Sequence, residues 1–150
     1  MLTRPTGRQT LCINRTSYGT ADADQGCFGT ALAWDISALY KIPDTISSED
    51  AGPLLCGGAT VWSPLYDSNV KPGDRVGIIG IGGLGHMAIQ FASKMGLEVV
   101  VFSGTESKKQ EALAFGASEF HATNNKESWD SIRPLDILLI TTSVNPKMSL

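Results

Sequence analysis

The sequence lacks several features that would assign it to a specialised class of protein. It has no uninterrupted apolar run of about 18 residues, so no membrane-spanning helix is predicted. Its net charge is only −3, with 12 basic and 15 acidic residues mixed along the chain. Neither nucleic acid nor an acidic membrane surface is therefore an expected partner. The segment Met1–Thr10 lacks the apolar core of a secretion signal, and we expect a cytoplasmic protein.

Cysteine is scarce. The three cysteines, Cys12, Cys27 and Cys56, are odd in number and widely spaced. This pattern argues against a disulfide framework, which pairs many cysteines in a short secreted chain. It also argues against a self-contained metal knuckle, because no two cysteines have the short CxxC spacing that such a site uses.

The chain has a glycine-rich turn in an informative context. Apolar residues at Val76–Ile79 predict a buried strand, and Gly80, Gly82 and Gly85 follow with GxGxxG spacing. Apolar residues then recur at helical spacing over Leu84–Met95. A strand, a glycine turn and a helix in this order are typical of a dinucleotide-binding βαβ unit.

Glycine is needed at each of the three positions for a different physical reason. Gly80 permits the tight turn, Gly82 lets the backbone approach a pyrophosphate, and Gly85 lets the helix pack closely on the strand. The helix N-terminus then offers unpaired N–H groups and a positive dipole end to an anion. His86, in the first helical turn, could approach the cofactor, although such a residue more often caps local backbone.

The remaining elements are predicted from periodicity and turn residues, in three segments: 1–42, 43–69 and 70–150. We expect short strands within Phe28–Ile42, and a short helix after Ser47, whose spacing to Asp50 is that of a capping box. Further elements are expected as a helix over Gly58–Tyr66, a strand over Leu97–Phe102, a helix over Glu106–Phe115, and strands over Ser118–His121 and Leu135–Ile140.

The end of the second predicted strand indicates which dinucleotide binds. An NAD site usually places an Asp or Glu about 20 residues after the glycine motif, but Ser103 stands there. Thr105, Lys108 and Lys109 follow, and hydroxyls and ammonium groups suit a 2′-phosphate. The sequence therefore favours NADP over NAD. The alternative is that Ser103 and Glu106 cap the next helix and the lysines are solvated.

Four collinear stretches resemble one family. They are DQGCFG at 24–29, KIPDTISSEDAGPLLCGGATVW at 41–62, VKPGDRVGIIGIGGLGHMAIQFASKMG at 70–96 and FSGTESKK at 102–109. Together they resemble the zinc-dependent medium-chain alcohol dehydrogenases, within the NADP-dependent cinnamyl-alcohol-dehydrogenase-like group. The resemblance implies an α/β fold: a partial Rossmann domain at 70–150 with about four parallel strands, preceded at 1–42 by the tail of a GroES-like, β-rich catalytic domain.

The resemblance also implies roles for individual residues. Cys56 matches a ligand of the catalytic zinc, Cys12 resembles the last ligand of a structural zinc, and Thr60 matches a residue at the nicotinamide end of the cofactor. The implied NADP(H)-binding positions are Thr60, Gly80, Gly82, Gly83, Leu84, Gly85, Ser103, Thr105 and Lys108.

The family's other zinc ligands have no counterpart here. Zinc requires about four donors, so we expect that this chain alone does not hold the metal. We expect an internal fragment or truncated form of an oxidoreductase that moves hydride between NADP(H) and a primary alcohol or aldehyde, inactive alone and possibly homodimeric at full length. Two alternatives stay open: a non-catalytic NADP(H)-binding module, and a zinc-independent quinone-type reductase.

Overall fold

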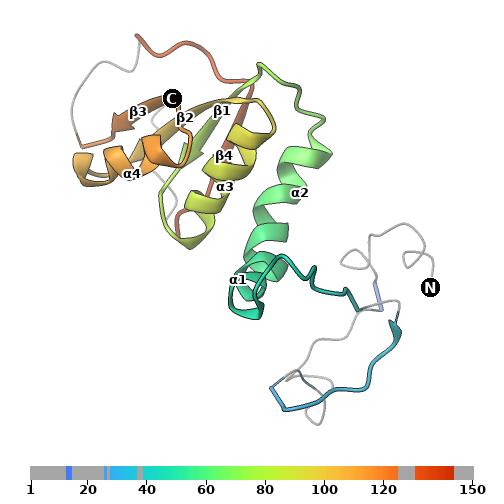
Figure 1. The fold of residues 1–150 in the computed structure, drawn as a ribbon. Helices are drawn as coiled ribbons and strands as arrows, with labels where there is room; N and C mark the ends of the chain where they lie inside the picture. Colours follow the sequence, from blue (N-terminus) through green and yellow to red (C-terminus); the bar gives the residue numbers. More distant parts are fainter. Residues whose placement is uncertain (1–12, 15–25, 27, 37–38, 125–130, 144–150) are drawn as a thin grey trace. The chain divides into compact units, whose positions relative to one another are not determined.

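The computed structural model describes residues 13–14, 26, 28–36, 39–124 and 131–143. The chain divides into two compact units, Met1–Lys41 and Ile42–Leu150 (Figure 1). The predicted site residues that the structure describes all belong to the second unit. Cys12, the predicted ligand of a structural zinc, lies outside the described residues, as does Cys27.

The strands predicted within Phe28–Ile42 are absent from the described residues of that range, so this prediction is wrong there. The side chains of Phe28, Ile36 and Tyr40 are exposed to 111%, 85% and 81%. β-Forming residues favour a strand chiefly when they pack against neighbouring strands, and these side chains have no such packing.

The second unit is built on a four-stranded parallel sheet, which confirms the predicted α/β class. Its strands are β1 (Arg75–Ile79), β2 (Glu98–Ser103), β3 (Glu119–Ala122) and β4 (Ile137–Ile140). Their order across the sheet is β3-β2-β1-β4, and β1 pairs in register with both β2 and β4. The chain thus adds strands on one side of β1 and then crosses to the other side.

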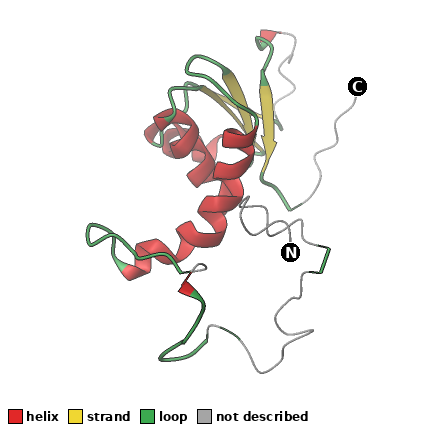
Figure 2. Ribbon diagram, turned by 90° about the vertical axis from the view of Figure 1, so that its right-hand side faces the viewer, coloured by secondary structure: helices red, strands yellow, loops and turns green. Residues whose placement is uncertain are grey.

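Two crossover helices cover one face of the sheet (Figure 2). They are α3 (Gly83–Lys94), between β1 and β2, and α4 (Lys109–Ala114), which follows the short 3₁₀ helix η5 (Glu106–Lys108) and leads to β3. Alternate strand residues and one side of α3 form the core, because their side chains meet between the layers. Its fully buried members include Val76, Ile78, Val99, Val101, Ala88, Ile89 and Ala92.

A continuous helical segment precedes the sheet: α1 (Ser48–Pro53), the π-helix η4 (Leu54–Gly58) and α2 (Ala59–Asp67). Ser47 caps its start, because its hydroxyl accepts a hydrogen bond from the Asp50 N–H at 3.1 Å. The cap predicted at Ser47 is therefore confirmed. The π-helix between the two predicted helical pieces was not expected from the sequence.

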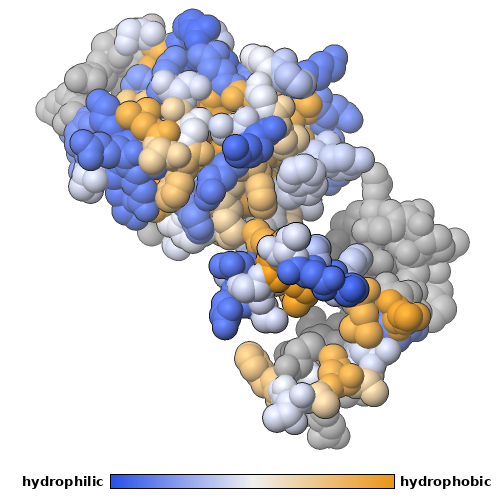
Figure 3. Space-filling view, viewed as in Figure 1, coloured by the Kyte–Doolittle hydropathy of each residue, from blue (hydrophilic) through white to orange (hydrophobic). Residues whose placement is uncertain are grey.

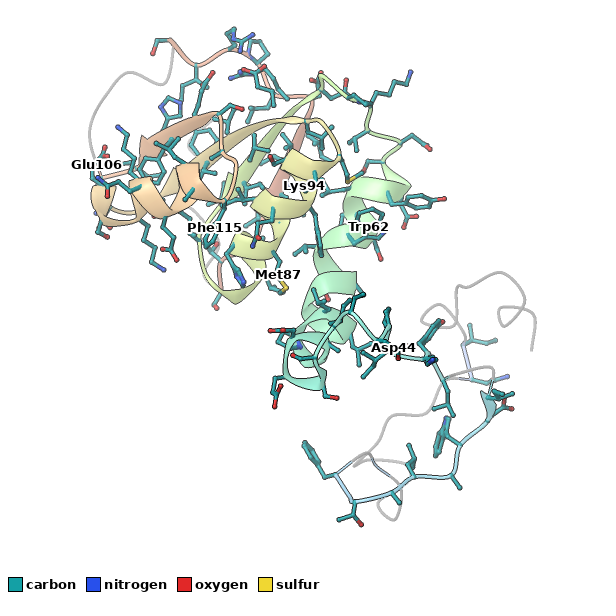
Figure 4. All side chains as sticks on the ribbon, viewed as in Figure 1. Asp44, Trp62, Met87, Lys94, Glu106 and Phe115 are labelled. Carbon is teal, nitrogen blue, oxygen red and sulfur yellow. The ribbon has the colours of Figure 1, made fainter. Side chains whose placement is uncertain are left out.

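The helical segment packs on α3. The rings of Trp62 on α2 and Phe91 on α3 meet edge to face, with centroids 5.7 Å apart. Met87 of α3 also faces this segment (Figure 4), and a Cβ added to Gly57 would lie 2.7 Å from the Met87 terminal methyl carbon. A side chain at position 57 would therefore require the end of the Met87 side chain to move.

An ionic cluster lies at the edge where the strands begin, opposite the glycine turn. Arg75 is 6% exposed, and its Nη1 and Nη2 atoms donate to the two carboxylate oxygens of Glu119 at 2.9 and 3.2 Å. Arg75 also pairs with Glu98, and Arg133 and His121 complete the cluster. The hydrogen bonds from Arg75 lower the pKa of Glu119 from its ordinary value of 4.5 to about 2.

The visible surface of the second unit is mixed in character. Hydrophobic side chains are interspersed with hydrophilic ones on this face (Figure 3). Leu55 and Tyr66, on the helical segment, are 65% and 66% exposed. In the part of the chain that the structure describes, no helix combines the length and apolar character needed to span a membrane.

Candidate cofactor-binding site

The glycine turn joins β1 to α3, and two of its glycines are required by geometry. Gly80 has φ +95°, in the left-handed region that residues with a side chain rarely adopt. A Cβ added to Gly85 would lie 2.0 Å from the Gly80 carbonyl oxygen. The structure therefore gives Gly80 the tight turn, and Gly85 the close contact of helix with strand, that the spacing predicted.

The other two glycines form the open side of the turn. Gly82 is the N-cap of α3 and Gly83 is its first residue; both are exposed, and a Cβ added to either would meet no atom within 4 Å. No side chain caps the helix at Gly82. The first N–H groups of a helix have no intrahelical partner, so an anion can approach them here from solvent.

The polar segment after β2 reaches back to this turn. Lys108 donates a hydrogen bond from Nζ to the Ile81 carbonyl oxygen at 2.8 Å. Ser103 is the last residue of β2, and the Thr105 hydroxyl lies 2.8 Å from that of Ser107. Lys108 thus places positive charge beside the turn, while the predicted site for the 2′-phosphate of NADP stays a prediction. The bond between Lys108 and Ile81 was not predicted.

Cys56 lies in the middle of the π-helix η4, and its side chain is exposed. Its neighbour Gly57 touches α3, because an added Cβ would lie 3.6 Å from the Leu84 Cδ2 atom. Leu84 belongs to the first turn of α3. The fold therefore brings the Cys56 segment next to the start of the helix that carries the glycine turn. Thr60, in the first turn of α2, is also exposed.

The donor set for zinc is incomplete. In the described ranges, no group of three or more His, Cys, Asp or Glu side chains is arranged to hold a metal ion. Cys56 offers one thiolate, whereas zinc sites use about four donors. The described residues therefore do not fit a zinc ion.

Two further side chains contact the turn, and one of them, Thr141, was not predicted from the sequence. Thr141 directly follows β4, and its Oγ1 donates to the Ile79 and Gly80 carbonyl oxygens at 2.9 and 3.2 Å. The Nδ1 atom of His86 lies 3.1 Å from the Gly82 carbonyl oxygen, which fits the backbone-capping role considered for it. The only sequence signal for Thr141 is its position after the last apolar strand, because its contact requires that β4 lie beside β1.

Comparison with known proteins places these features in context. The family model described as zinc-binding dehydrogenase matches residues 83–136. The probable formaldehyde dehydrogenase AdhA of Bacillus subtilis is 47% identical over 134 residues, which are 86% of this chain and 38% of that protein. The chain thus spans well under half the length of this curated relative.

Two solved structures are similar to this chain in sequence and in fold. The structure of CAD from Helicobacter pylori, complexed with NADP(H), is 40% identical with a TM-score of 0.60, over 67% of this chain and 28% of that one. A cinnamyl alcohol dehydrogenase of Sorghum bicolor is 37% identical with a TM-score of 0.65, over 71% of this chain and 31% of that one. The aligned parts share the partial Rossmann fold.

Proposed function

Because the chain belongs to the zinc-binding dehydrogenase family, in the group of the alcohol and cinnamyl alcohol dehydrogenases, we propose that it is the NADP(H)-binding part of an oxidoreductase that interconverts alcohols and aldehydes. The observation that carries this proposal is the glycine turn. It is closed at Gly80 and Gly85, where strand and helix touch, and open at Gly82 and Gly83, where the helix N-terminus meets solvent.

Different residues of the chain would bind different parts of the cofactor. The N–H groups at Gly82, Gly83 and Leu84 would bind the diphosphate, since the N-terminus of the 12-residue helix α3 favours negative charge. Ser103, Thr105 and Lys108 would bind the 2′-phosphate, and Thr60 would contact the nicotinamide end. NADPH, when bound, supplies the hydride that reduces an aldehyde carbon.

A second candidate is a nucleotide-binding module without catalysis. It is favoured by the lone position of Cys56 among the described residues, since one thiolate cannot hold the metal that the family uses. Saturable binding of NADPH by the purified chain, without NADPH-dependent reduction of an aldehyde, would support this candidate. Reduction of the aldehyde that a chelator abolishes would contradict it.

The proposed binding site is tested with Gly82→Asp. The backbone at Gly82, with φ −100° and ψ −160°, accommodates a side chain, and a Cβ there meets no atom within 4 Å. An Asp at this N-cap would satisfy the free N–H groups of α3 and repel the diphosphate. We expect NADPH affinity, measured by calorimetry, to fall on the order of a hundredfold, with thermal stability kept or raised.

The matched control is Asn69→Asp, which adds the same charge at an exposed residue between α2 and β1. It should bind NADPH as the wild type does. The proposal is contradicted if the wild-type chain does not bind NADPH, or if Gly82→Asp binds it as well as the control.

A further inference from the structure

One hydroxyl group supports the glycine turn from a different strand. The Oγ1 atom of Thr141 donates to the carbonyl oxygens of Ile79 and Gly80, at 2.9 and 3.2 Å. A hydroxyl has one hydrogen, so the two carbonyls share it. The backbone N–H of Thr141 also donates to the Ile79 oxygen at 3.0 Å. Thr141 therefore fixes the point where β1 ends and the turn begins.

The strand order places Thr141 at a particular point of the fold. β1 lies between β2 and β4: the chain adds β2 and β3 on one side of β1 and then adds β4 on the other side. In open α/β sheets, ligands bind in the crevice beyond the carboxyl ends of the strands, where the strand order reverses. Thr141 is the first residue beyond the carboxyl end of β4, and its hydroxyl contacts the turn that follows β1.

The Thr141 hydroxyl also occupies the space that two glycines leave free. A Cβ added to Gly80 would lie 3.3 Å from its Oγ1 atom, and a Cβ added to Gly85 would lie 3.0 Å from it. The oxygen is thus packed between the first and last glycines of the GxGxxG motif. A methyl group in its place would keep most of this packing but would not donate to the carbonyls.

The next two carbonyls of the turn are held differently. The Ile81 oxygen accepts from Lys108, whose ammonium group carries further donors, and the Gly82 oxygen accepts from the backbone N–H and the ring of His86 within α3. Thr141 is distinct because it links the turn to β4, across the switch point of the sheet.

We propose that Thr141 is a positioning residue: its hydroxyl holds the Ile79–Gly80 backbone in the conformation that directs the helix N-terminus at the diphosphate of NADP(H). This inference rests on the proposed function. Thr141 lies outside the glycine motif but would preorganise it. Without the hydroxyl, the turn would have to be ordered when the cofactor binds, and this would weaken binding.

The test compares Thr141→Val, which keeps the shape but removes the hydroxyl, with Thr141→Ser, which restores it. The two probes are NADPH and adenosine 2′-monophosphate, which has the 2′-phosphate but no diphosphate. We expect Thr141→Val to weaken NADPH binding about five- to tenfold and to leave adenosine 2′-monophosphate binding unchanged. Thr141→Ser should bind both as the wild type does. Thr45→Val, at an exposed turn residue, is the matched control.

Each other outcome overturns the inference. If Thr141→Val binds NADPH as tightly as the wild type, the hydroxyl does not position the turn, although the proposed function stands. If Thr141→Val weakens both probes equally with a lowered melting temperature, Thr141 supports the fold only. If the wild-type chain binds neither probe, the proposed function fails and the inference fails with it.

Discussion

At the scale of single residues, we propose that Lys108 carries the preference for NADP over NAD. Its ammonium group has three N–H donors, and one of them is used by the Ile81 carbonyl. Lys108 is exposed, so the remaining two donors are available to a ligand. The bond to Ile81 already restricts the orientations of the side chain, so less freedom is lost on binding. A 2′-phosphate would therefore meet a charge that is already positioned.

This preference is tested with Lys108→Met, which keeps the length of the side chain and removes its charge. A hydrogen bond to a charged group contributes about 1.5–3 kcal/mol, so we expect NADPH affinity to fall about ten- to a hundredfold. Affinity for NADH, which has no 2′-phosphate, should stay nearly constant. Fluorescence titration with the two cofactors measures both values.

The neighbouring lysine is the control. Lys109 is exposed, and its Nζ atom lies 3.7 Å from a Glu106 carboxylate oxygen. Lys109→Met should leave the ratio of the two affinities unchanged. Equal losses for NADPH and NADH in Lys108→Met would mean that Lys108 supports the turn and does not read the 2′-phosphate.

Individual residues differ in how far the sequence predicts them. The need for glycine at positions 80 and 85 is local, because a tight turn and a helix that starts beside its own strand require it wherever the motif occurs. Thr141 could not be predicted in the same way. Its contact with Gly80 depends on β4 pairing with β1, which follows from the strand order and not from any spacing.

At the scale of elements, the beginning of the sheet is held by charge. Glu119, at the start of β3, accepts two hydrogen bonds from Arg75 of β1, and His121 and Arg133 lie at 3.3 and 3.6 Å from its oxygens. Its pKa is lowered to about 2 in the folded state. A lowered carboxylate pKa contributes stability above the unfolded pKa, and this contribution is lost as the pH falls through the folded value.

Glu119→Gln should therefore lower the free energy of unfolding at neutral pH and flatten its pH dependence between about 4.5 and 2. Removing one partner of a buried ion pair costs about 3–5 kcal/mol, but the Glu119 side chain is 33% exposed and Arg75 keeps Glu98. We expect a loss of about 1–3 kcal/mol, measured by urea denaturation across this pH range.

Glu111→Gln, at an exposed position of α4, is the control and should follow the wild-type pH profile. A Glu119→Gln profile parallel to the wild type would show that the cluster does not contribute to acid stability.

The strands of the sheet and the helices between them were predicted from local signals, whereas the π-helix was not. The strand at 75–79, the helix starting at 83 and the Ser47 cap follow from apolar periodicity and turn chemistry. The π-helix at Leu54–Gly58 could not be predicted, because its extra residue per turn has no periodic signature in the sequence.

At the scale of the whole molecule, the apolar core formed by the described residues lies in the unit Ile42–Leu150. The buried hydrophobic side chains of the described residues all lie between Ala51 and Phe120. The described large hydrophobic residues before Ile42, such as Phe28 and Ile36, are exposed. Burial of apolar surface is the main favourable contribution to folding, so we expect the second unit to fold without the first.

A variant that lacks residues 1–41 tests this independence. The site residues proposed for NADP(H), from Thr60 to Lys108, and the supporting Thr141 all lie in the unit Ile42–Leu150. We expect the shortened chain to unfold cooperatively with the same midpoint as the full chain and to bind NADPH with the same affinity. Circular dichroism and calorimetry measure the two properties. A lower midpoint or a lost binding signal would show that residues 1–41 contribute to the cofactor-binding unit. If the shortened chain with Gly82→Asp keeps the NADPH affinity of the shortened chain, the measured binding does not occur at the glycine turn.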